Sequence, residues 1–262
     1  MSTRRMPLAM RAAFQDLFLV TYAVSPDVLG RLLPPAIHPW VHGGRSYISI
    51  VVGNLRGMAP RPIPETFGTN YYQIVYRAVV AIRPREGPER RGVYFLRSDA
   101  NDPVMSFFGN RLTEFRFHYF QTGAIGMFRR DDRVLVSVES EDGGGDLVVC
   151  MANQGAAEDH LPAAGFASVG DEKEILVELF NAYAHDTEAG CVYDLEIERG
   201  EWELKRLAAV DQFSAFLEEE PFTGANAELL SLLAIENCEY VWKPMKRIEV
   251  TDLLGKEPRA GA

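Results

Sequence analysis

Short apolar runs of β character follow one another closely along this chain, separated by turn residues. They lie at 17–24, 46–52, 71–82, 92–96, 115–120, 124–128, 134–138 and 147–151. Glycine, proline and charged residues stand between them, as expected of strands joined by turns. Many short strands with few helices favour a closed or strongly coiled β-structure with helices packed outside it. We therefore expect a mainly β (α+β) fold.

Three short segments carry helix signals. Ser25 can cap a helix that starts at Pro26, and Pro34 ends it after two turns. Apolar residues at helical spacing, with acidic residues in the first turn, predict the best helix over 171–183. A further short helix is expected over 227–234. The stretch 57–70 is rich in glycine and proline, and we expect it to be a long loop of the kind that often binds ligands.

Charge and cysteine content exclude several classes of protein. The formal net charge is −10, with 37 acidic against 27 basic residues, which disfavours general nucleic-acid binding. No apolar run approaches the ~20 residues that span a bilayer, so no membrane partner is expected. The three cysteines are far apart and odd in number, which fits reduced thiols in a cytoplasm. We expect one domain over 14–250, flanked by flexible ends at 1–13 and 251–262.

The common cofactor and nucleophile motifs are absent. No glycine pattern opens a helix as a phosphate loop, and the glycines at 143–145 suit a hairpin turn. His38 and His42 lie in a Pro/Gly loop, which is a poor setting for a zinc site. No GxSxG elbow occurs. We expect neither a metal nor a cofactor.

Residues 109–120 interleave charged and aromatic side chains. Over 114–119 the alternation has period two, so on a strand Glu114, Arg116 and His118 share one face. If that face points into a barrel, a carboxylate, a guanidinium and an imidazole converge in a cavity. The alternative is that the face meets solvent while the aromatic residues form the core.

The order of features resembles the YqjF-like proteins (domain of unknown function 2071), a branch of the acetoacetate decarboxylase-like superfamily. The matching segments run in the family's order: Val24–Pro34, Tyr72–Val80 with Arg77, Gly92–Ala100, Glu201–Leu204 with Ala208, and Val241–Pro244. The resemblance extends thinly over about residues 14–248 and implies a coiled, cone-like antiparallel β-barrel with an internal cavity and a few peripheral helices. Relatives in the superfamily are commonly oligomeric, so a homodimer is the expected assembly.

The resemblance also points to an absent nucleophile. Acetoacetate decarboxylases form a Schiff base through a lysine whose pKa is depressed by a neighbouring cation. Laying the family's Gly-x-x-x-x-Gly-aromatic-Pro segment on 109–118 puts Phe117 and His118 at the lysine positions. The acid that these families carry on an earlier strand appears here as Gln73. Phenylalanine cannot form an iminium and glutamine cannot transfer a proton, so Schiff-base decarboxylation is not expected.

Three functions stay open at this point. In the first, the protein binds a small carboxylate or carbonyl metabolite through side chains that can hold a carboxylate; these candidates are Gln73, Arg77, Arg97, Arg111 and Arg116. In the second, it is a lysine-independent isomerase, hydratase or cyclase with Glu114 and His118 as catalytic acid and base. In the third, the interior is packed and the domain is a structural or interaction module.

Overall fold

The computed structural model describes residues 6–103, 105, 107, 119–223 and 227–253. The strands are β1 Met10–Val24, β2 His38–Pro39, β3 Ser46–Pro60, β4 Thr69–Ile82, β5 Arg90–Ala100, β6 Tyr119–Arg130, β7 Arg133–Ser140, β8 Leu147–Ala156, β9 Asn181–Asp186, β10 Cys191–Arg199, β11 Leu204–Ser214, β12 Glu228–Trp242 and β13 Lys246–Glu249. The helices are α1 Pro26–Leu32, α3 Val169–Leu176 and α4 Ala215–Glu218, with 3₁₀ turns at Glu65–Phe67, Ala157–Asp159 and Val250–Asp252. This is the mainly β fold that was predicted.

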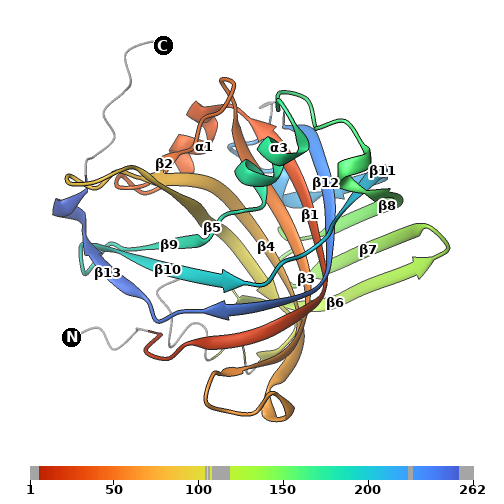
Figure 1. Cartoon of the computed structure of the whole chain (residues 1–262), viewed down its shortest axis with the longest axis horizontal. Helices are drawn as coiled ribbons and strands as arrows, with labels where there is room; N and C mark the ends of the chain where they lie inside the picture. The colour runs from red at the N-terminus through yellow and green to blue at the C-terminus, as the bar shows by residue number, and fades with distance from the viewer. Residues whose placement is uncertain (1–5, 104, 106, 108–118, 224–226, 254–262) are drawn as a thin grey trace.

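The thirteen strands of the described chain form one sheet that closes on itself twice. One ring runs β4-β5-β6-β7-β8-β11-β12-β1-β3 and returns to β4. A smaller ring runs β4-β5-β9-β10-β12-β1-β3 and also returns to β4, because β10 pairs with the end of β12. Both rings contain β12, β1, β3, β4 and β5, which we call the shared wall. In Figure 1 the shared wall lies in the middle, with β9 and β10 on one side of it and β6, β7 and β8 on the other.

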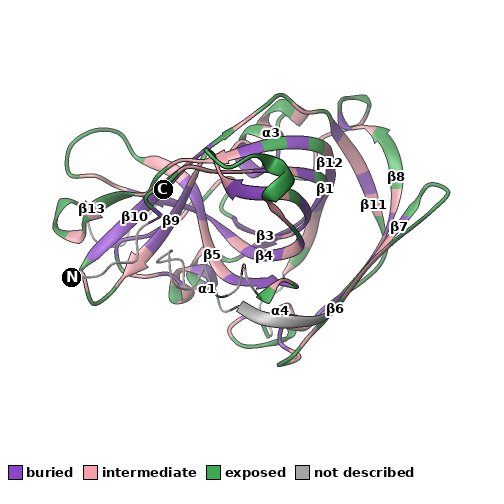
Figure 2. Ribbon diagram, turned by 90° about the horizontal axis from the view of Figure 1, so that it is seen from below, coloured by how far each residue is buried: buried purple, intermediate pink, exposed green. Residues whose placement is uncertain are grey.

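The shared wall is buried on both faces, and successive residues face different cores. On β1, Leu17 and Leu19 belong to the core of the smaller ring, whereas Phe18 and Val20 belong to the core of the larger ring. The same alternation holds on β12, where Leu233 and Leu232 face opposite ways. Strands buried on both faces are near-continuous apolar runs without alternation, as these are. Figure 2 shows buried residues along β1, β3, β4 and β12, and also along β9 and β10.

Two predicted helices differ from the structure. The segment 227–234 belongs largely to β12, whose leucines point to both faces of the strand and so do not alternate with polar residues. The helix expected over 171–183 is α3, which ends at Leu176, and Tyr183 lies instead in β9. The helical spacing continues past Leu176 because Leu179 and Tyr183 are also buried, in a non-helical conformation, whereas Phe180 is exposed.

Other expectations fit closely or in part. Ser25 caps α1 by accepting a hydrogen bond from the Asp27 amide, with Pro26 in the first turn. The predicted loop at 57–70 is shorter than expected, because β3 extends to Pro60 and β4 starts at Thr69. β1 starts at Met10, four residues before the predicted start of the domain, and pairs there with β12. Within the described residues, no helix is both long and apolar enough to pass through a bilayer.

Candidate functional site: an arginine-lined cavity in the smaller ring

A cavity of about 70 Å³ lies inside the smaller ring. Its walls come from the shared wall, from β10 and from the segment after α3. The apolar lining residues are Phe14, Leu17, Leu19, Val51, Val75, Val93, Phe95, Val177, Ile197, Ile235 and Trp242. Among the described residues, the polar side chains on this lining are Arg77, Arg199 and Tyr240. Charged groups on an apolar wall need an explanation, because burying a charge without a partner is costly.

Arg77 projects into the cavity from β4, on the same strand face as Val75 and Val79. Its Nη2 donates a hydrogen bond to the main-chain oxygen of Leu176 at 3.1 Å, while its Nε is buried and without a partner in the described structure. The pKa of Arg77 is lowered to about 10, because the lowering by burial, together with a smaller lowering by the nearby Arg199, outweighs the raising by Tyr240. The guanidinium therefore stays positively charged at neutral pH.

Arg199, at the end of β10, lies beside it. Its Nη2 donates to the Val177 carbonyl oxygen at 2.6 Å and its Nη1 to the Tyr240 hydroxyl at 3.3 Å. The guanidinium carbon lies 4.0 Å from the ring centre of Trp202 and 4.5 Å from that of Phe180. Such cation–π contacts hold a guanidinium in place without neutralising it.

Neither arginine forms an ion pair with a carboxylate among the described residues, although 18 ion pairs occur elsewhere in that part of the chain. Burial raises the pKa of the third polar group, Tyr240, although Arg199 opposes the effect. Its hydroxyl is therefore neutral at physiological pH and can donate a hydrogen bond. The lining thus offers two cations and a neutral donor. These groups suit an anion.

The last residue of α3, Leu176, and the residue after it, Val177, supply the two carbonyls that hold the arginines. Ser168 caps the helix by accepting a hydrogen bond from the Asp171 amide at 3.0 Å. Glu172 anchors it: its two carboxylate oxygens accept from both Nη atoms of Arg206 at 2.7 Å each, and Oε1 accepts from Ser231 at 2.5 Å. Burial alone would raise the pKa of Glu172, but the hydrogen bonds from Arg206 and Ser231 hold it below its ordinary value. A buried ion pair thus sets the position of the helix end at the cavity.

Of the residues predicted from the sequence, the structure brings Arg77 to the cavity. Gln73 lies four residues earlier on the same face of β4 and donates from Nε2 to the Ser98 hydroxyl at 3.1 Å. It does not line the cavity. Arg111, Glu114, Arg116 and His118 lie outside the described residues, so their shared face stays a prediction.

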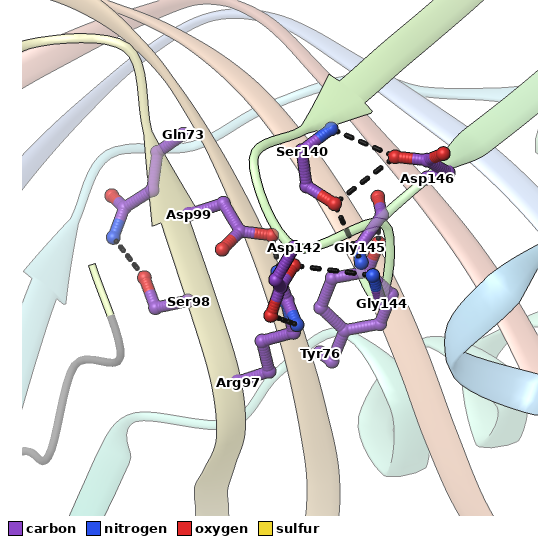
Figure 3. Close-up of polar contacts among 10 residues, drawn as sticks. All are labelled: Gln73, Tyr76, Arg97, Ser98, Asp99, Ser140, Asp142, Gly144, Gly145 and Asp146. Atoms are coloured by element: carbon purple, nitrogen blue, oxygen red, sulfur yellow. Dashed lines mark hydrogen bonds and ion pairs between the residues drawn. The ribbon is translucent and has the colours of Figure 1, made fainter. Parts of the chain in front are cut away.

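Arg97, another candidate from the sequence, lies on the opposite face of the shared wall from Arg77 and does not line this cavity. Its Nε donates to Asp99 at 2.9 Å, and its two Nη atoms bind Asp142 at 3.0 and 2.7 Å. Figure 3 shows this cluster under the turn between β7 and β8, where Tyr76 also donates to the Gly145 carbonyl oxygen at 2.9 Å. Its guanidinium is occupied by two carboxylates and ties this turn to the shared wall.

Arg199 and Tyr240 were not among the residues predicted from the sequence. Arg199 lies three residues before Trp202 and Tyr240 two before Trp242, each just outside a segment that carried the family resemblance. The aromatic residues beside an arginine were the available signal. What could not be read was the pairing of β10 with β12, which brings Arg199 opposite Tyr240.

The described lysines all lie away from the cavity and pair with carboxylates. Lys173 pairs with Glu178, Lys205 with Glu236, and both Lys243 and Lys246 with Glu196. The fifth lysine, Lys256, lies outside the described residues. Within the described chain, no group of three or more histidine, cysteine or acidic side chains is placed to hold a metal.

Comparison with protein families gives one match. The model of domain of unknown function 2071, described as an uncharacterized conserved protein, matches residues 11–235. No curated protein matches the sequence.

Several solved structures share the fold. Acetoacetate decarboxylase from Legionella pneumophila has a TM-score of 0.63 at 11% identity, covering 94% of this chain and 89% of its own. The enduracididine biosynthesis enzyme MppR, complexed with the condensation product of pyruvate and imidazole 4-carboxaldehyde, has a TM-score of 0.60 at 12% identity, covering 93% and 90%. An acetoacetate decarboxylase-like enzyme from Sphingomonas wittichii RW1 has a TM-score of 0.59 at 12% identity, covering 93% of each chain. At these identities the likeness shows the fold alone.

Proposed function

This chain belongs to the uncharacterised family of domain of unknown function 2071, and we propose that it binds a small carboxylate or carbonyl metabolite in the cavity of the smaller ring, without Schiff-base decarboxylase activity. The observation that carries the proposal is the pair Arg77 and Arg199, two guanidinium groups on an apolar lining with no carboxylate partner among the described residues. Both residues are half-buried, and charges withdrawn from water are usually paired; a bound carboxylate would pair these.

The cavity has a size that suits such a ligand. A cavity needs about 10–15 Å³ of such space to hold one water molecule, so 70 Å³ has room for roughly five waters. That is the space of a molecule with a few carbon atoms. MppR, one of the proteins with a similar fold, has been solved with pyruvate, and the same class of small oxo acid is a reasonable ligand to test here. A lining with two charged groups also favours binding over a merely packed interior.

The absence of Schiff-base chemistry rests on the lysines. An imine requires a lysine that is neutral and within reach of the substrate carbonyl. Each of the four described lysines is held at the surface by a carboxylate, and for Lys243 the bound carboxylates raise the pKa and so favour the charged form. Treating the protein with acetoacetate or pyruvate and borohydride should therefore give no mass increase in the intact protein. A stoichiometric adduct on any lysine would contradict this part of the proposal.

Binding is tested by calorimetry with acetate, pyruvate and acetoacetate on three proteins. Arg77→Gln should weaken binding by about tenfold or more, because a hydrogen bond to a charged group contributes about 1.5–3 kcal/mol. Arg130→Gln is the matched control, since it also removes one positive charge but from a side chain that is 94% exposed. Equal affinity in all three proteins, or no binding of any acid to the wild type, would refute the cavity as an acid-binding site.

Arg111, Glu114, Arg116 and His118 enter the proposal as predicted contributors from the segment before β6. Arg116→Ala and His118→Ala, measured in the same assay, test whether that strand face joins the cavity. Loss of affinity in these variants would place it there, and unchanged affinity would separate it from the site.

A further inference from the structure

The charge around the cavity does not balance with one negative charge. Arg77 and Arg199 bring two positive charges, and the described lining residues bring none of the opposite sign. The carbonyls of Leu176 and Val177 at the end of α3 offset part of this, since a helix C-terminus carries roughly half a negative charge. More than one positive charge remains. A ligand with a single carboxylate would leave one guanidinium without a counter-charge.

The two guanidinium groups are close neighbours. They donate to the carbonyl oxygens of consecutive residues, Leu176 and Val177, whose Cα atoms are about 3.8 Å apart. Tyr240 joins them, because its hydroxyl accepts from Arg199 at 3.3 Å and its charge state also affects the pKa of Arg77. All polar groups of the described lining therefore gather on one side of the cavity.

The rest of the described lining is apolar. Phe14, Phe95 and Trp242 are aromatic, and the other residues are aliphatic. A hydroxyl on the middle of a ligand would find no hydrogen-bond partner on these walls, and an unpaired buried polar group costs about 1–3 kcal/mol. The walls favour a ligand whose carbon skeleton carries no hydroxyl group.

Resting on the proposed function, we infer that the cavity selects a short, unhydroxylated dicarboxylate whose two carboxylates lie close together, one on each arginine. A skeleton of about three or four carbons matches the room for roughly five waters. Arg77 and Arg199 each hold one carboxylate through bidentate or single hydrogen bonds, and Tyr240 donates a further hydrogen bond between them. Close spacing of the carboxylates follows from the close spacing of the guanidinium groups.

Two matched pairs of compounds test the inference by calorimetry on the wild-type protein at pH 8, where both carboxyl groups are ionised. Malonate and propionate have the same number of carbons but two and one carboxylates. Maleate and fumarate have the same composition but near and distant carboxylates. Malonate should bind about tenfold or more tightly than propionate, and maleate more tightly than fumarate by a similar factor.

Variants identify the groups responsible. Arg77→Gln and Arg199→Gln should each reduce the affinity for malonate to that for propionate, whereas Arg130→Gln should preserve the difference. If a glutamine variant does not fold, Arg77→Lys and Arg199→Lys keep the charge and should retain a reduced preference for malonate. An unchanged preference in the variants that fold would assign it to other residues and overturn the inference.

The wild-type results separate this inference from the proposal beneath it. Propionate binding as tightly as malonate, or fumarate as tightly as maleate, would overturn the dicarboxylate inference and leave carboxylate binding in place. Failure of every acid to bind would overturn both.

Discussion

Asp99 illustrates how much one buried side chain depends on its surroundings. It is fully buried, and burial raises its pKa to about 6 although Arg97 donates a hydrogen bond to Oδ2. Its Oδ1 is buried with no hydrogen-bond partner in the described structure. Asp142, bound by the same arginine but partly exposed, has its pKa lowered by that arginine's hydrogen bonds. One guanidinium thus holds two carboxylates with opposite pKa shifts.

The substitution Asp99→Asn tests this at the residue scale. A pKa raised on folding means that the native state binds more protons than the unfolded state between about pH 4 and 6, so stability falls as pH rises through that window. Asparagine does not titrate. The difference in free energy of unfolding, variant minus wild type, should therefore increase by up to about 3 kcal/mol from pH 4 to pH 7. Urea unfolding at several pH values measures it.

Asp142→Asn is the control with the opposite sign. The pKa of Asp142 is lowered on folding, so this carboxylate contributes stability above its ordinary pKa of 3.8 and loses that contribution as pH falls. Its variant should be less stable than wild type at pH 7 and nearly equal to it in acid. Parallel pH profiles for the two variants would contradict the assignment.

At the scale of elements, α3 matters most because its last carbonyls hold Arg77 and Arg199. Eight residues are too few for a helix to be stable alone, so tertiary contacts must fix it. The pair of Glu172 with Arg206 is the main polar contact, and the Glu172 carboxylate is only 1% exposed. The position of the cavity arginines therefore depends on an ion pair on another side of the helix.

Glu172→Gln should destabilise the protein by about 3–5 kcal/mol at neutral pH, because it leaves the Arg206 charge buried without its partner. The wild-type contribution should also fade as pH drops below about 4.5, since the pKa of Glu172 is lowered on folding. Glu174→Gln is the matched control on the same helix, where the side chain is 66% exposed and the cost should stay below about 1 kcal/mol. Urea unfolding gives the stabilities, and hydrogen exchange should show faster exchange over 169–176 in the first variant alone. Equal effects of the two substitutions would contradict the role of Glu172 in fixing α3.

The sequence predicted the elements whose signals are local, and failed where distant contacts decide. Ser25 and Pro26 mark the start of α1 in the sequence, and the structure has the helix there. The end of α3 could not be predicted, because Leu176 and Val177 bind arginines from β4 and β10. The sequence of 227–234 predicts a helix because a strand buried on both faces lacks the alternation that identifies most strands.

The candidate site was predictable only in part for the same reason. Arg77 was found because it lies in a segment that resembles the family. Arg199 was missed because it needs β10 to pair with β12 before it meets Tyr240. Arg77 and Arg97 are both candidates from the sequence, and they face opposite cores. A bulge between Tyr76 and Arg77 in the pairing with β5 shifts the register there, and such a shift leaves no mark in a single sequence.

At the scale of the whole molecule, the smaller ring closes where β5 meets β9. The pairing is short, joining Val93 with Ala182 and Tyr94 with Tyr183. Gly92 lies beside it, and a Cβ at this position would overlap the carbonyl oxygen of Asn181 and lie 2.7 Å from the Tyr183 ring. Glycine is needed here because two backbones approach closely.

Gly92→Ala should lower the free energy of unfolding by about 2 kcal/mol or more, since the overlapping atom is backbone and cannot rotate away. Because the same strands enclose the cavity, the variant should also bind malonate less tightly. Gly200→Ala serves as control, because a Cβ there meets nothing within 4 Å, and its stability should be unchanged or raised by about 0.5 kcal/mol. Urea unfolding and calorimetry measure the two effects. A Gly92→Ala protein as stable as the control would show that the pairing of β5 with β9 tolerates a wider separation of the two strands.

Successive residues of the shared wall face different cores, and this alternation has a consequence for how the chain can evolve. Neighbouring residues such as Tyr76 and Arg77 belong to different compartments, so alternate positions along each strand of the wall face alternate cores. Insertion or deletion of one residue in β4 would exchange the compartments of every residue beyond it, sending Arg77 into an apolar core and Tyr76 into the cavity. Point substitutions can change the cavity lining one position at a time. An insertion or deletion within these five strands would instead disrupt the packing of both cores at once. Insertions and deletions in related chains should therefore fall in the turns and spare the shared wall.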